Sequence, residues 1–149
     1  MTLAITTVTA SIAALSVTGL SIRDVDNIPV EVLDRMCPIL YPEPIEFVSS
    51  FVVTPMSFGT AGSGHFDVDY VLRYAFAFML PGSVRGSLSR YKEFVQLWED
   101  LWDKIIISDN ITGCVSLMPA GSVSFGPILD PSGKTVIGSH VLFGVKEFE

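Results

Sequence analysis

The run HFDVDYVLRYAFAFML, residues 65–80, alternates large apolar residues with other residues almost without interruption. Alternate side chains of an extended chain point to the same face, so this pattern predicts one continuous β-strand over 66–80. Such a strand reaches about 50 Å, whereas a compact chain of 149 residues is about 38 Å across. We therefore expect part of the strand to extend beyond its own subunit.

The two halves of this strand differ on the face opposite the large residues. Over 66–72 that face carries Asp67 and Asp69, which is typical of a strand with one buried side. Over 75–80, AFAFML is apolar on both faces, which is typical of a strand buried on both sides. We expect the second half to run through the core and the first half to leave it.

The segment before the long strand predicts its hairpin partner. FVVTPM, 51–56, has the β-branched and aromatic content of a strand, and FGTAGSGHF, 58–66, is a glycine-rich tip. The two strands and this tip make a projecting β-hairpin arm. We expect the arm to contact a neighbouring subunit through Phe66, Val68 and Tyr70, with Asp67 and Asp69 at the same interface.

The rest of the chain predicts two helices and further strands. Residues 2–18 read as a helix that ends at Gly19, and 88–106 has apolar residues at three- and four-residue steps. Strands are expected at 39–41, 114–126 and 138–149, the last two separated by the turn sequence LDPSGK. The predicted fold is α+β, a mostly antiparallel sheet with two helices packed on one face and the projecting hairpin arm.

Composition fits one domain over residues 1–149 that has apolar surface to spare. The chain is 49% hydrophobic and 17% charged, below the charged fraction of about 25% in average soluble domains, which favours assembly. A net charge of −7 excludes binding of nucleic acid through clustered basic residues. The N-terminal stretch has no basic residue before Arg23, so we expect no export signal and no membrane span, and a protein made in the cytoplasm.

The sequence shows no set of residues with catalytic or metal-binding spacing. His65 and His140 lack an acid and a nucleophile in a recognisable pattern, and GTAGSG, 59–64, leads into a strand rather than into a phosphate-binding helix. Cys37 and Cys114 lie too far apart in sequence for a zinc motif and are expected as thiols. Two closely spaced carboxylate pairs are read as surface groups rather than cation sites: Asp24 with Asp26, and Asp67 with Asp69. We expect no enzyme, no cofactor and no metal.

The order of elements resembles the tail-terminator, or tail-completion, proteins of long-tailed bacteriophages. The resemblance lies in PILYPEP, the hairpin into HFDVDYVLRYAFAFML, the helix SRYKEFVQLWEDLWDKI and the closing VLFGVKEFE. It implies a virion protein, assembled in the host cytoplasm, that forms a hexameric ring at the head-proximal end of the tail tube. Such a ring ends tube polymerisation and joins the tail tube protein to the head connector and neck proteins. DNA then passes through the lumen without specific binding, because an acidic lumen repels it.

Two other interpretations remain open at this point. The first is a head-completion or neck connector protein of the same particle, because the acidic connector 20–37 and the glycine-rich tip depart from the tail-terminator layout. The second is a small-ligand-binding α+β domain whose apolar pocket is lined by Trp98, Trp102, Tyr70 and Tyr74.

Overall fold

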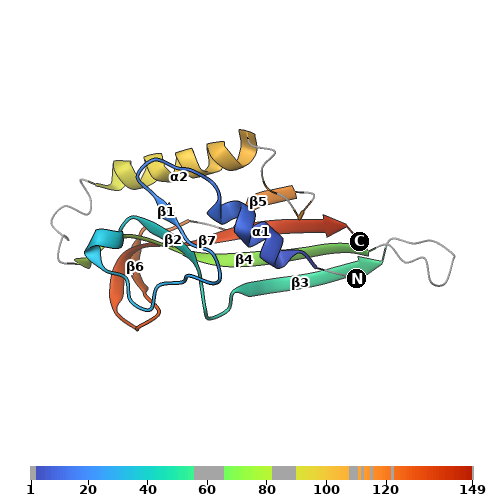
Figure 1. Ribbon diagram of the computed structural model, residues 1–149, viewed down its shortest axis with the longest axis horizontal. Helices are drawn as coiled ribbons and strands as arrows, with labels where there is room; N and C mark the ends of the chain where they lie inside the picture. Colours follow the sequence, from blue (N-terminus) through green and yellow to red (C-terminus); the bar gives the residue numbers. More distant parts are fainter. Residues whose placement is uncertain are drawn as a thin grey trace.

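The computed structural model describes residues 3–55, 66–81, 90–107, 111, 113–114, 116–121 and 123–148. Figure 1 shows two helices lying against an elongated sheet. In chain order the elements are α1 (Ile5–Ala13), β1 (Ser21–Ile22), a 3₁₀ turn (Asp34–Met36), β2 (Ile39–Pro42), β3 (Val48–Pro55), β4 (Phe66–Met79), α2 (Tyr91–Ile107), β5 (Ser116–Ala120), β6 (Gly126–Leu129) and β7 (Thr135–Phe148). The predicted α+β class is confirmed.

The sheet is built around β4 and β7, which pair antiparallel from Asp67↔Phe148 to Met79↔Ile137. Each of these long strands has two short strands on its outer side. β3 and β2 follow one another along β4, and β5 and β6 follow one another along β7. β1 pairs parallel with β2, and all other strand pairs are antiparallel. The mostly antiparallel sheet is therefore confirmed.

Both helices pack on one face of this sheet, as predicted. Val8 and Ile12 are one helical turn apart in α1, and Phe94 and Leu101 lie on the apolar stripe of α2. These four side chains join one core with alternate residues of the two long strands. On the sheet side the core consists of Val68, Tyr70, Leu72, Tyr74, Phe76, Phe78, Val141, Phe143 and Val145. The alternation of apolar residues in 66–78 therefore reflects the burial of this one face of β4.

The first half of β4 does not leave the core, and this corrects the argument from strand length. Val68 and Leu72 are fully buried, and Tyr70 is nearly so. β7 is as long as β4 and runs beside it, while α1 contributes Val8 and Ile12 to the same core. The estimate of 38 Å assumed a sphere, whereas the molecule is extended along its two long strands (Figure 1). The length of the strand therefore gives no support for assembly.

Other boundaries differ because of turns that the periodicity did not reveal. α1 ends at Ala13, and Gly19, with a φ of 84°, closes a tight turn between Val17 and Leu20 instead of ending the helix. The expected strand 114–126 is divided into β5 and β6 around Gly121, which has a φ of 67°. The tip of the hairpin, 56–65, lies outside the described residues.

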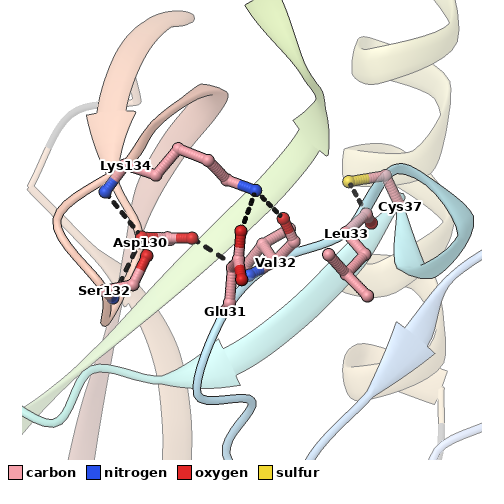
Figure 2. Close-up of polar contacts among 7 residues, drawn as sticks. All are labelled: Glu31, Val32, Leu33, Cys37, Asp130, Ser132 and Lys134. Atoms are coloured by element: carbon pink, nitrogen blue, oxygen red, sulfur yellow. Dashed lines mark hydrogen bonds and ion pairs between the residues drawn. The ribbon is translucent and has the colours of Figure 1, made fainter.

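The face opposite the helices is covered at one end only. There the connector 24–38 and the β6–β7 hairpin contribute Val32 and Ile128 to a small second core over Ala75 and Ala77. Figure 2 shows how the hairpin turn holds the connector. The buried Asp130 accepts hydrogen bonds from the backbone N–H of Val32 (3.0 Å) and from Ser132 Oγ (2.6 Å), and Lys134 Nζ donates to the Val32 carbonyl (2.7 Å).

The hydrogen bonds by which Asp130 holds the connector to the hairpin turn are sensitive to acid. Burial by itself raises the pKa of Asp130, but hydrogen bonds from Ser132 and from the backbone of Val32 and Lys134 outweigh it and lower the pKa below the ordinary value. The stabilisation from these hydrogen bonds is fully present above the unfolded-state pKa of about 3.9. It is lost as the pH falls through the lower pKa of Asp130 in the folded state.

We expect Asp130→Asn to lower the free energy of unfolding by about 1 to 2 kcal/mol at neutral pH. Below about pH 4 the difference from the unmodified protein should shrink, because the native carboxylate becomes protonated. Urea unfolding followed by circular dichroism over a pH series measures both effects. Asp26→Asn, an exposed position in the same connector, serves as the control. Identical pH profiles for the two variants would contradict this role for Asp130.

Candidate assembly surface

The five residues predicted at a subunit interface do not form one surface. Val68 and Tyr70 are buried in the core of their own chain, so the prediction that their side chains contact a neighbour is wrong. Phe66 is half-buried and packs against the same core. Asp67 and Asp69 lie on the opposite face of the strand. The alternation that suggested an interface is the ordinary alternation of a strand with helices on one side.

Asp67 and Asp69 both form ion pairs with one lysine of the neighbouring strand β7. The register places Asp69 opposite Lys146, whose Nζ lies 3.4 Å from Asp67 Oδ2 and 3.9 Å from Asp69 Oδ1. In the part of the chain that the structure describes, no group of three or more His, Cys, Asp or Glu side chains is placed to hold a metal ion. Both carboxylates are thus paired with one lysine side chain of the protein, Lys146.

Tyr70 has a structural role that the sequence did not reveal. Its hydroxyl donates a short hydrogen bond to the Glu147 carboxylate, which also accepts from the backbone N–H of Ala4 at 3.0 Å. Glu147 is buried, so these bonds compensate for the removal of its charge from water. Burial, this hydrogen bond and the charge of Glu147 all raise the pKa of Tyr70. The contact joins the start of α1 to the two long strands.

The aromatic residues of the alternative ligand-binding interpretation form core rather than a pocket. Trp98 and Trp102 meet edge to face at 5.6 Å, and Trp102 lies 5.5 Å from Phe143. Tyr74 meets the same Phe143 at 4.9 Å and is fully buried. The prediction of a pocket lined by these side chains is wrong, because they fill the space between α2 and the sheet.

β3 is the most exposed strand of the described structure. It pairs with β4 on one side, and no described strand pairs with its other edge. Phe51, Val52 and Val53 keep 45%, 51% and 37% of their surface exposed. The strand sequence VSSFVVTP contains no charged residue, and of the features that protect natural edge strands it has a bulge between Ser49 and Val52 and the terminal Pro55. Figure 1 shows β3 as a long strand along the border of the sheet.

The surface beside β3 continues across the face that carries Asp69 and Lys146. A shallow hollow of about 300 Å³ runs from Ser50 and Val52 past Val71 to Met118 of β5. β3 therefore adjoins a half-apolar surface as well as a free backbone edge. Sequence reasoning recognised a strand at 51–56 but not that its outer edge is free; the one available signal was the absence of charge in 48–55.

The remaining chemically reactive side chains are placed as follows. Cys37 and Cys114 are free thiols, as expected, and burial and the nearby Asp34 raise the pKa of Cys37 to about 11. His140 lies against Glu43, with Nδ1 3.1 Å from Oε1. His65 and the glycine-rich segment 59–64 lie outside the described residues.

Comparisons of the chain with protein-family models and with curated proteins find no match. Within the described ranges, neither helix has both the length and the apolar composition needed to cross a membrane.

Proposed function

We propose that this protein is a structural subunit that assembles with copies of itself into a ring. The observation that carries the proposal is the free, uncharged and largely apolar edge of β3. An exposed edge presents a row of backbone N–H and C=O groups to which another strand can pair. Left unpaired, such an edge is prone to aggregation, so a defined partner strand is the physically favourable outcome.

The strand directions support a head-to-tail arrangement. At this end of the sheet the order is β3, β4, β7, β5, and each neighbouring pair is antiparallel. β3 and β5 consequently run in opposite directions on opposite borders. β5 of one copy and β3 of an identically oriented copy would thus pair antiparallel and continue the sheet. Repetition of a head-to-tail contact closes into a ring when its rotation permits.

The resemblance to tail-terminator proteins suggests where such a ring acts. In this proposal a hexameric ring sits at the head-proximal end of a phage tail tube, stops its growth and joins it to the neck. Each subunit brings a formal net charge of −7, so that the ring is strongly acidic and DNA passes without being held.

Native mass spectrometry of a β3 edge variant tests the assembly. We expect the unmodified protein to have a mass six times 16.2 kDa. Val52→Lys should leave a folded chain of single-subunit mass, because a charge on the edge disfavours strand pairing. Val30→Lys, at an even more exposed valine outside the sheet, should remain in the ring. A monomeric unmodified protein, or a Val52→Lys variant that keeps the ring, would contradict the proposal.

A second experiment separates the place in the particle from the assembly itself. Purified tail tubes mixed with the protein and imaged by negative stain should show a ring on one end only, with no further tube growth. Rings that ignore tail tubes and bind head particles would instead support the neck connector interpretation.

A further inference from the structure

The backbone hydrogen bonds of Arg73 show which way the backbone groups of β4 point. The Arg73 N–H donates to the carbonyl of Phe47 at 2.8 Å, and the Arg73 carbonyl accepts from the N–H of Glu43 at 3.0 Å. Both groups of Arg73 therefore point toward the β2–β3 side of the strand. Such directions alternate along an antiparallel strand. Odd-numbered residues of 67–73 thus face β3, and even-numbered residues face β7.

The same alternation identifies the free backbone groups of β3. Val52 and Thr54 lie opposite odd-numbered residues of β4, so their backbone groups point back at β4. The backbone groups of Val53 and Pro55 consequently point outward, to the free edge. Proline has no N–H. Over 52–55, Val53 is therefore the one residue that offers both a donor and an acceptor to a further strand.

The free edge of β5 has a similar arrangement. Even-numbered residues of β4 lie opposite odd-numbered residues of β7, so the even-numbered residues of β7 face β5. Ser116, Met118 and Ala120 lie opposite these residues. Leu117 and Pro119 consequently point outward, which puts the proline nitrogen on the free border where a sheet tolerates it. Over 116–120, Leu117 is the one residue that offers both a donor and an acceptor.

The two prolines select the register in which these edges can pair. Antiparallel strands exchange two hydrogen bonds wherever two residues that point at one another are opposite. Between 52–55 and 116–120, only Val53 opposite Leu117 allows both bonds. A slip of two residues that sets Val53 against Pro119 also sets Leu117 against Pro55, and each pair then loses one bond.

The side chains agree with this register. It opposes three pairs of similar character: Val52 with Met118, Val53 with Leu117, and Thr54 with Ser116. Val52 and Met118 are 51% and 62% exposed in the single subunit, so their contact covers two exposed apolar side chains. Val53 and Leu117 each lie opposite a core residue of their own chain, so the helices of both copies lie on the same side of the continued sheet. Neither strand brings a charged residue to the contact.

We propose that the β3 edge of one copy binds the β5 edge of the next copy in this one register, with Val52 packed against Met118 of the neighbour. Pro55 and Pro119 are positioning residues, because they deny hydrogen bonds to the slipped register. This inference rests on the proposed ring, to which it adds the residues that meet at each joint.

A disulfide across the joint tests the register. Residues 52 and 118 would form a non-hydrogen-bonded pair, whose Cα atoms are about 4.5 Å apart, within the range of a disulfide. Val52→Cys combined with Met118→Cys should give multiples of 16.2 kDa on a non-reducing gel after mild oxidation. Thr54→Cys with Met118→Cys, which samples the slipped register, should stay at single-subunit mass. Each single variant should do so too, which controls for Cys37 and Cys114.

Native mass spectrometry of the same samples separates the two proposals. A ring that does not cross-link through positions 52 and 118 contradicts the register but leaves the ring standing. A single-subunit mass for the unmodified protein contradicts both. Cross-linking of Val52→Cys alone means that two β3 strands pair with each other, and this also contradicts the inference.

A charge pair gives a second test that does not depend on oxidation. Val52→Lys is expected to be a single subunit, and adding Met118→Glu should restore the ring because the two charges face one another across the joint. Val52→Lys with Leu129→Glu is the matched control, since Leu129 is also 62% exposed but lies in β6, and it should remain a single subunit. Equal behaviour of the two double variants would overturn the proposed register.

Discussion

Replacing Gly138 by alanine is expected to destabilise the protein more than any other single methyl addition considered for the sheet. A Cβ atom at position 138 would lie 1.8 Å from the carbonyl oxygen of Phe76 and 3.2 Å from Cα of Ala77. Both atoms belong to the backbone of β4, so no side-chain rotation relieves the clash, and the two central strands must separate. We expect a loss of about 3 kcal/mol or more in the free energy of unfolding, which lowers Tm by about 10 °C for a chain of this length.

Gly144→Ala is the matched control on the same strand and the same face. Its Cβ would meet the Met118 carbonyl oxygen at 3.4 Å and Ala120 Cβ at 3.6 Å, which are ordinary contacts. Alanine in a strand interior is otherwise favoured over glycine by about 0.5 to 1 kcal/mol, so this variant should be as stable as the unmodified protein or slightly more so. Thermal unfolding of both variants by calorimetry provides the measurement. Equal Tm values would show that β4 and β7 do not approach so closely at Gly138.

Removal of the Tyr70 hydroxyl is expected to have the second largest effect. Tyr70→Phe leaves the buried Glu147 carboxylate with the Ala4 N–H as its remaining described donor. A hydrogen bond to a charged group contributes about 1.5 to 3 kcal/mol, so we expect a loss of about 2 to 3 kcal/mol in the free energy of unfolding. Amide hydrogen exchange should also become faster in α1, because Glu147 holds its first turn to the sheet.

Tyr74→Phe tests whether the effect belongs to the hydrogen bond or to any buried tyrosine. Tyr74 lies on the same strand and the same face, but its hydroxyl has no partner among the described residues. Its removal should be neutral or slightly stabilising, since an unsatisfied buried group disappears. Denaturant unfolding of the two variants measures the difference. Equal destabilisation would mean that the contact with Glu147 contributes little.

The long strand and the second helix could be predicted from the sequence because their periodicity is a local property. The apolar residues alternate in 66–78 and recur at three- and four-residue steps in 91–106. Each pattern indicates one buried face and is visible without knowing which element packs on that face. The class of fold followed from the order of these patterns. The covering partner of 66–72 could not be predicted, since α1 and β7 come from opposite ends of the chain.

The candidate sites could not be predicted from the sequence, for a related reason. The groove lined by Tyr41 and His140 requires the register that aligns both residues with Ala75 on three neighbouring strands. The free edge of β3 depends on which strands fail to reach it. Neither is visible in the spacing of residues along one segment.

By itself, the sequence determined where the long strand β4 and the helix α2 lie, that one side of each is apolar, and the acidic character of the molecule, because these depend on neighbours in the chain and on composition. Only the tertiary structure decided that Tyr70 binds Glu147 in the core, that no described strand pairs with the outer edge of β3, and that Tyr41, Arg73 and His140 line one groove. These features arise from contacts between residues far apart in sequence, such as Ala4 and Glu147, and such contacts depend on how the strands come together.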